Sequence, residues 1–205
     1  MTVKGLERGR RAALLISEMQ NGITDPAFRE TPLAEQVRAR GIVDTINELA
    51  AGFRTRGLPV VHCTVTARPD FLGWNRNCVL AARIHKEANL VSGSSFAAIH
   101  DDIVVGDSDI ISERHHGMAA FTGTDLDATL RGLGIDTVVF CGVSTNVALM
   151  GGSVEAVGHG YTVVIAEDCT AGGTAETHQV QIAMHLPLVA SVSTKDAVLA
   201  SEALN

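Results

Sequence analysis

TVVFCGVSTNVAL, residues 137–149, joins an apolar run to the start of a helical segment through a glycine. Residues 137–141 predict a buried strand, and residues 146–159 predict a helix that stops at Gly160. The first turn of such a helix has unpaired backbone N–H groups and the positive end of the helix dipole, which stabilise a thiolate or a developing oxyanion. The position therefore suits a nucleophile, yet Ala148 places only a methyl group there.

Strand-like and helix-like segments alternate along the rest of the chain. Further strands are expected at 12–17, 59–65, 109–112, 161–166 and 188–192. Further helices are expected at 33–56, where Gly41 is a weak point, at 124–134 and at 175–185. This alternation predicts an α/β fold, with a three-layer, doubly wound, mostly parallel sheet of about six strands and Rossmann-like connections.

The length and composition are typical of one globular α/β domain, which we expect to span residues 1–205. The chain has 205 residues, of which 46% are hydrophobic and 4% aromatic, so the core consists mainly of Val, Ile, Leu and Ala. Its formal net charge is −7 and it has no run of Lys or Arg, which argues against a nucleic-acid partner. No signal peptide or membrane-length apolar run is visible, so we expect a cytoplasmic protein without a membrane partner.

The four cysteines indicate buried thiols rather than a metal site. Cys63, Cys78, Cys141 and Cys169 are widely spaced, without a CxxC pair. A reduced cysteine at the end of an apolar run behaves as a small hydrophobic residue. We therefore expect no metal.

Polar residues follow the predicted strands, where doubly wound sheets bind their ligands. Glu18 follows the first strand and is a candidate general acid or base, although the position alone favours a surface loop glutamate. Arg114, His115 and His116 follow the third strand and are candidates for proton transfer or anion binding. An exposed loop pair is the alternative for the two histidines.

The turn after the fourth strand is a candidate oxyanion hole. Residues 142–146 can direct backbone N–H groups at a developing negative charge, or can simply be a strand-to-helix turn capped by Thr145 or Asn146. Ser144 is a weak candidate nucleophile because its neighbours do not form a G-x-S-x-G elbow. Arg68 and Asn75, after the second strand, are candidates for substrate contact or a solvated loop.

The irregular segment from Thr66 to Asn77 contains Phe71 and Trp74, which a disordered linker rarely carries. We expect this segment to form a pocket wall or a contact between subunits.

Five pieces of sequence together resemble one family. They are ALLISEMQN (13–21), GLPVV (57–61), AFTGTDLD (120–127), GIDTVVFCGVSTNV (134–147) and GYTV (160–163). In this order and spacing, the chain from about Arg11 to Ala200 resembles the isochorismatase-like superfamily, whose cysteine members include nicotinamidases and N-carbamoylsarcosine amidases. The resemblance implies an isochorismatase-like fold, no cofactor, and assembly as a homodimer or homotetramer.

The resemblance also implies a changed catalytic set. The family's Asp falls on Glu18, its Lys on His115 with Arg114 and His116 as the neighbouring choices, and its nucleophilic Cys on Ala148. It implies a cis peptide between Val143 and Ser144 and an oxyanion hole from the N–H groups near Ser144 and Ala148. It places Phe121 and Asn146, with Arg114 and His116, among the substrate-binding residues.

An alanine cannot form a covalent intermediate, so the standard cysteine amidase mechanism does not apply to this chain. True isochorismatases, in which an acidic residue protonates a vinyl ether, offer a thiol-free precedent. The leading hypothesis is a non-thiol hydrolase of a small polar or anionic molecule, with Glu18 and His115 as catalytic residues. The alternatives are a catalytically silent binding or scaffold protein, and a C–N amide hydrolase with a relocated nucleophile.

Overall fold

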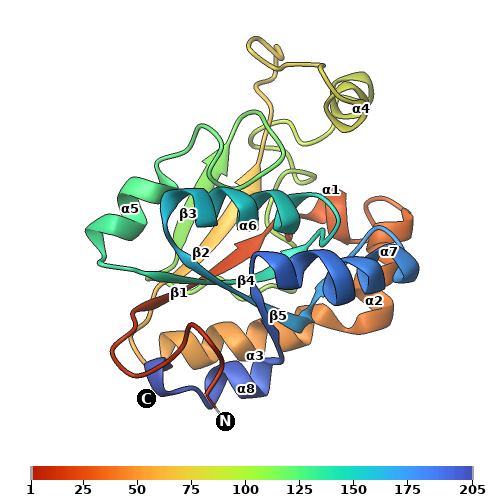
Figure 1. Cartoon of the computed structure of the whole chain (residues 1–205). Helices are drawn as coiled ribbons and strands as arrows, with labels where there is room; N and C mark the ends of the chain where they lie inside the picture. Colours follow the sequence, from red (N-terminus) through yellow and green to blue (C-terminus); the bar gives the residue numbers. More distant parts are fainter. Residues whose placement is uncertain (1, 205) are drawn as a thin grey trace.

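A single parallel sheet forms the centre of the computed structural model, which describes residues 2–204 (Figure 1). The strands lie in the order β3 (Ile110–Arg114), β2 (Val60–Val65), β1 (Ala12–Ser17), β4 (Thr137–Val143), β5 (Thr162–Ala171) and β6 (Ser191–Ser193). All neighbouring pairs are parallel, as the alternation of segments predicts. The strand order reverses between β1 and β4, and doubly wound sheets bind ligands at such a reversal.

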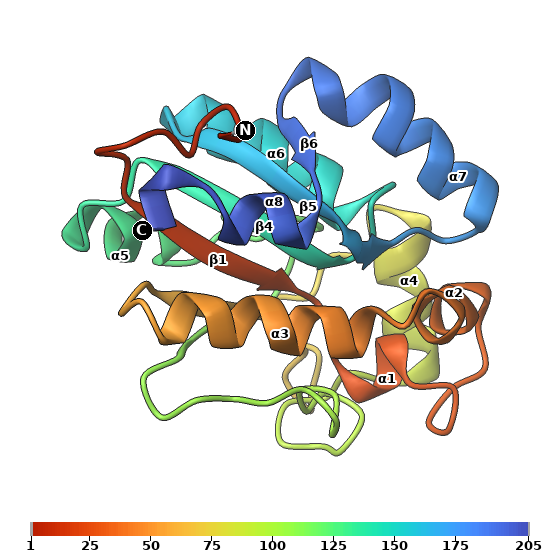
Figure 2. The ribbon, with the colours of Figure 1, turned by 90° about the horizontal axis from the view of Figure 1, so that it is seen from below.

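Helices connect the strands and cover both faces of the sheet. They are α1 (Asn21–Thr24), α2 (Pro32–Arg40), α3 (Ile42–Arg54), α4 (Val79–Glu87), α5 (Leu126–Gly132), α6 (Ala148–His159), α7 (Ala175–Val180), with a π-helical continuation over Gln181–His185, and α8 (Lys195–Leu199). Figure 2 shows α3 and α6 on opposite faces of the sheet. Within residues 2–204, none of the helices has the length and apolarity needed to cross a bilayer.

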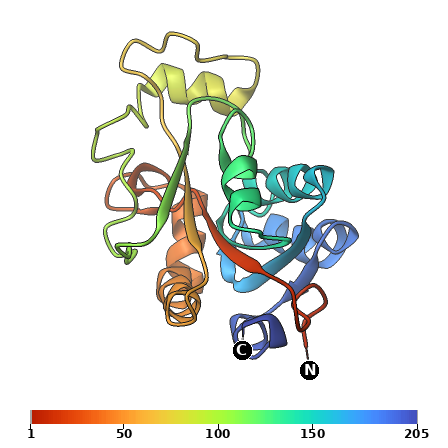
Figure 3. The same cartoon turned by 90° about the vertical axis from the view of Figure 1, so that its left-hand side faces the viewer.

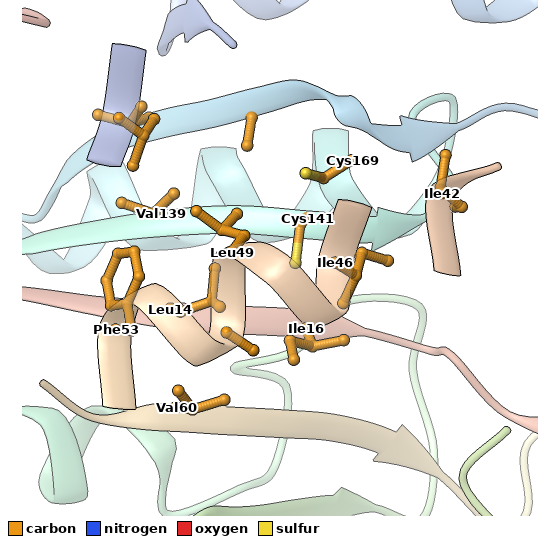
Figure 4. Packing of buried hydrophobic residues seen from close by; sticks show 14 of the residues in the cluster. Leu14, Ile16, Ile42, Ile46, Leu49, Phe53, Val60, Val139, Cys141 and Cys169 are labelled. Carbon is orange, nitrogen blue, oxygen red and sulfur yellow. The ribbon is translucent and has the colours of Figure 1, made fainter. Parts of the chain in front are cut away.

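The core has two parts because successive strand residues point to opposite faces of the sheet. On β1, Leu14 and Ile16 pack with Leu49 and Phe53 of α3 (Figure 4), while Leu15 packs in the second cluster on the other face. All five side chains are buried. A strand with both faces covered reads as a continuous apolar run, so this strand could be predicted from the sequence.

Several predicted elements have different boundaries in the structure. The helix expected over 33–56 is two helices, because Gly41 adopts φ 63°, which ends α2 before α3 begins. The last strand begins at Ser191 rather than Leu188, whose side chain is 79% exposed. The third strand continues to Arg114 instead of ending at Ser112. Three short helices, α1, α4 and α8, were not predicted.

A buried ionic cluster links Arg54 at the end of α3, His62 of β2 and Asp109, which directly precedes β3. Arg54 donates to both oxygens of Asp109 at 2.9 and 2.6 Å, and His62 Nε2 lies 2.7 Å from Asp109 Oδ2. Burial lowers the pKa of His62 below its ordinary value, although the carboxylate of Asp109 opposes the effect. The imidazole is therefore neutral at pH 7 and serves as a hydrogen-bonding group.

Candidate active site

A cavity of about 320 Å³ opens beside the carboxyl ends of β1 and β4. One part of its wall comes from residues that follow strands: Glu18, Val65, Arg114, Gly117, Met118, Ser144, Asn146, Val147 and Gly173. The other part comes from α1, α2, α4 and their loops: Gly22, Ile23, Arg29, Thr31, Pro32, Leu33, Leu80, Arg83, Ile84, Asn89 and Leu90. Its position agrees with the expectation for this sheet order.

Glu18 is held at the cavity by an unusual backbone conformation. Its φ is 51°, in the left-handed region that residues other than glycine seldom adopt. The Glu18 N–H donates to the carbonyl of Cys63 at 2.8 Å. The buried side chain of Gln20 then donates to the carbonyls of Val65 and Ala97 and accepts from the Val65 N–H. These bonds fix the chain on both sides of Glu18, as is typical of strained functional positions.

Arg114 is the charged partner of Glu18. It is the last residue of β3, and its side chain is only 3% exposed. Its Nη2 donates to Glu18 Oε1, and its Nε donates to the carbonyl of Gly117 at 3.5 Å. A guanidinium that is buried next to a carboxylate forms a directional, charge-assisted contact. The pair joins the ends of β1 and β3 at the cavity wall.

The turn between β4 and α6 brings backbone donors to the same cavity. The peptide bond between Val143 and Ser144 is cis, where the family resemblance places one. Within the described chain, the N–H groups of Ser144 and Ala148 donate to no protein acceptor. Ala148 is the first residue of α6, so its N–H also lies at the positive end of the helix dipole. These donors suit an anionic oxygen, as an oxyanion hole requires.

Asn146 is oriented by the loop after β5. Its Oδ1 accepts from the N–H of Gly173 at 2.9 Å, which leaves its Nδ2 as a donor at the cavity. Behind it, Thr145 Oγ1 lies 3.4 Å from His178 Nδ1, and His178 Nε2 lies 3.3 Å from Glu167. Burial, reinforced by the charge of Arg40, lowers the pKa of His178. The neutral imidazole of His178 thus supports the turn through its contact with Thr145.

The thiols of the chain do not face the cavity. Cys63, Cys141 and Cys169 are buried in the core clusters, and Cys78 is exposed at the start of α4. Burial raises the pKa of Cys63 and of Cys169 to about 12 and that of Cys141 well above its ordinary value. Buried thiols of this kind stay protonated and are poor nucleophiles.

The structure brings together Glu18, Arg114, Ser144 and Asn146 from the residues singled out in the sequence. It does not bring His115 to Glu18, which corrects the expected geometry. The His115 side chain is 56% exposed, with Nδ1 3.2 Å from Thr66 Oγ1. Residues alternate in direction along a strand, so Arg114 points inward and the next residue points outward.

Four other candidates also lie outside the cavity lining. The His116 side chain is exposed beside Gly123, and Phe121 is buried with its ring stacked on Tyr161 at 5.9 Å. Arg68 is exposed and paired with Asp70, and Asn75 is exposed. The positions of His116, Arg68 and Asn75 fit the alternatives stated for them, and Phe121 packs in the core. Their proposed contacts with substrate find no support in this geometry.

The wall from α2 and α4 was not predicted from the sequence. Arg83, Asn89, Arg29 and Thr31 come from segments for which no functional role was considered. A weak signal was present: Leu80 and Ile84 are spaced by four, and Arg83 lies on the same helical face. Nine residues with one such pair are too short a pattern for a confident helix prediction.

The chain matches one protein-family model and is similar in sequence to curated proteins. The isochorismatase domain family matches residues 12–197. The uncharacterized isochorismatase family protein YecD of Escherichia coli O157:H7 is 32% identical over 193 residues, which are 93% of this chain and 95% of YecD. Maleamate amidohydrolase of Pseudomonas putida is 28% identical over 178 residues, 85% of this chain and 78% of that enzyme.

Among solved structures, a cysteine hydrolase from Pseudomonas syringae pv. phaseolicola 1448A superposes with a TM-score of 0.83. The match covers 97% of this chain and 95% of that protein at 21% identity. At this identity the superposition supports the fold alone.

Proposed function

This chain belongs to the isochorismatase family, and from that membership we propose that it hydrolyses a small polar or anionic molecule through Glu18, without a thiol. The observation that carries the proposal is the Glu18–Arg114 pair, which lines the same cavity as the turn at the start of α6. An acid–base group, a fixed cation and free backbone donors are the parts that hydrolysis by water requires.

For an amide substrate, the Glu18 carboxylate takes a proton from a water molecule as the water oxygen bonds to the carbonyl carbon. The carbonyl oxygen becomes an oxyanion, and the N–H groups of Ser144 and Ala148 donate to it. The C–N bond then breaks, and Glu18 returns the proton to the leaving nitrogen. Arg114 holds Glu18 in place and faces the developing negative charge.

The same site suits a vinyl ether. Glu18 in its acid form protonates the double-bond carbon, and water adds to the resulting cation and gives a proton to the Glu18 carboxylate. The C–O bond then breaks as Glu18 protonates the leaving oxygen, and Glu18 takes back the proton that the new hydroxyl group loses when it becomes the carbonyl. The similarity to maleamate amidohydrolase favours the amide over the vinyl ether. We therefore assign the role of charged partner of Glu18 to Arg114, whereas the sequence analysis expected His115 as the second catalytic residue.

A relocated nucleophile, the further alternative for an amide hydrolase, has less support. The thiols are buried or lie off the cavity lining, as described above. Ser144 lines the cavity, but no histidine or carboxylate lies within hydrogen-bonding distance of its hydroxyl in the described chain. Thr145 contacts His178, but its side chain is fully buried.

A catalytically silent binding protein is the second candidate. It is favoured by the methyl group of Ala148 at the start of α6, which cannot form a covalent intermediate. A silent protein would retain the cavity and bind the same class of small molecule. The two candidates differ only in turnover.

We also propose a single domain over residues 1–205 that acts in the cytoplasm as a homodimer or homotetramer, without metal or cofactor. The family match over 12–197 supports the single domain. The side chains of Leu72 and Val79, 73% and 74% exposed, lie around the start of α4 and support contact with another subunit.

An activity panel tests the function. We expect the purified protein to hydrolyse at least one member of a set of small amides, vinyl ethers and esters of carboxylic acids faster than buffer, measured by product chromatography. Hydrolysis of none, with binding of at least one member by a folded protein, would contradict the hydrolase and support the silent binder.

A further inference from the structure

One face of α4 forms part of the cavity wall. Leu80, Arg83 and Ile84 are spaced by three and four, so they share that face, and all three line the cavity. Figure 3 shows α4 and the loop before it extending from the body of the domain. The side chains of α4 therefore contribute to the selectivity of the cavity for its ligand.

The position of α4 is fixed by a small core of its own. Trp74 and Ala81 are buried in a cluster with Val65 and Leu90, and Phe71 packs against it. The indole N–H of Trp74 donates to the carbonyl of Ala81 at 2.9 Å. The segment with the two aromatic residues thus supports a cavity wall from behind, as one of the two expectations for it required.

Three arginines line the cavity, and they differ in their partners. Arg114 pairs with Glu18, and Arg29 Nη2 lies 2.6 Å from Glu87 Oε2. Arg83 has no carboxylate within 4.0 Å anywhere in residues 2–204. An unpaired guanidinium at a cavity is available for a ligand's anionic group, for which its planar donors are well suited.

Asn89 adds an acceptor to the same wall. Its Nδ2 donates to Glu87 Oε2 at 2.9 Å, which fixes the orientation of the amide. Its Oδ1 is buried and has no hydrogen-bond partner in the described chain. A buried polar atom without a partner is costly, so it points to a ligand that donates there.

We propose that Arg83 and Asn89 form a subsite that recognises the substrate's carboxylate and a neighbouring N–H or O–H group. This inference rests on the proposed hydrolase. The apolar side chains of Ile23, Leu33, Leu80, Ile84 and Met118 line the same cavity. The substrate class is then a small carboxylic acid with an apolar chain and a hydrolysable group that reaches Glu18.

Binding of two probes of equal length tests the subsite. The monoamide of adipic acid carries one carboxylate, and adipamide is its neutral counterpart. For Arg83→Gln, we expect the Kd for the monoamide to rise at least tenfold, while that for adipamide changes less than about twofold. Isothermal titration calorimetry measures both. Lys86→Gln, on the same helix but off the cavity lining, is the matched control and should leave both values unchanged.

The outcomes separate this inference from the proposed function. Equal monoamide binding by wild type and Arg83→Gln, or no binding by the wild type at millimolar concentration, overturns the subsite. Arg83-dependent binding without turnover of any panel member retains the subsite and contradicts only the hydrolase. A rise in Kd that is as large for Lys86→Gln also overturns the subsite, because it assigns the effect to net charge.

Discussion

Replacing Glu18 with glutamine is expected to lower kcat by about 10²–10⁴-fold, the usual contribution of a general acid–base group. Glutamine has nearly the same size and can still accept a hydrogen bond from Arg114, so the cavity wall should keep its shape. It cannot take a proton from water or return one to a leaving group. Steady-state kinetics on the best substrate from the panel would measure the loss.

Glu113→Gln is the matched control for this change. Glu113 precedes Arg114 on β3, but its side chain faces solvent and lies outside the cavity lining. We expect its kcat to stay within about twofold of wild type. If Glu18→Gln keeps a folded structure and a kcat within about threefold of wild type, Glu18 is not the acid–base group.

The second large effect is on stability and concerns Gly142, where β4 lies against the backbone of β1 without room for a side chain. Gly142 pairs with Ser17 across β1 and β4 and has φ 91°. A Cβ atom there would lie 2.3 Å from the carbonyl oxygen of Ser17, which is backbone and cannot move aside. Gly142→Ala combines this clash with left-handed strain, so we expect a loss of about 3 kcal/mol or more in unfolding free energy.

For a chain of this length, such a loss lowers the Tm by at least about 6 °C in a thermal melt followed by circular dichroism. Gly158→Ala provides the control. Gly158 is exposed on α6, and an added Cβ meets nothing within 4 Å. It should raise stability by up to about 1 kcal/mol, because alanine favours the helix. A Tm of Gly142→Ala within about 2 °C of wild type would contradict the close approach of the strands.

The sheet could be predicted because its strands are buried on both faces. β1 and β4 are mainly apolar, and the polar residues directly after them, Glu18 and Ser144, therefore fell at the correct edge. The parallel, doubly wound arrangement followed from the alternation of segments. The element boundaries were less well predicted: one expected helix is split at Gly41, whose left-handed conformation ends α2.

The partner of Glu18 could not be identified from sequence spacing. The predicted strand ended at Ser112, two residues early, so the direction of the side chains beyond it was undetermined. Pairing of Val65 with Arg114 extends β3, and the alternation of the strand then turns Arg114 inward and His115 outward. A shift of one residue along the strand therefore decides whether Arg114 or His115 points toward Glu18.

The α4 wall was missed for a different reason. Its residues face a cavity whose other side includes residues more than 50 positions away in the chain, such as Ser144. Arg83 gains its significance only from the absence of a nearby carboxylate among the described residues, which is a property of the folded arrangement. No local pattern in the sequence carries that information.

The central claim is that hydrolysis depends on Glu18 and water and requires no thiol. It is tested most directly by the kcat of a variant without cysteine, Cys63→Ala, Cys78→Ser, Cys141→Ala and Cys169→Ala combined. Cys63→Ala alone, next to the Glu18–Arg114 pair, serves as a second variant if the combined one fails to fold. We predict a kcat within about threefold of wild type for the folded variant. A loss of about 10³-fold or more in a folded protein would place a cysteine in the reaction and contradict the claim.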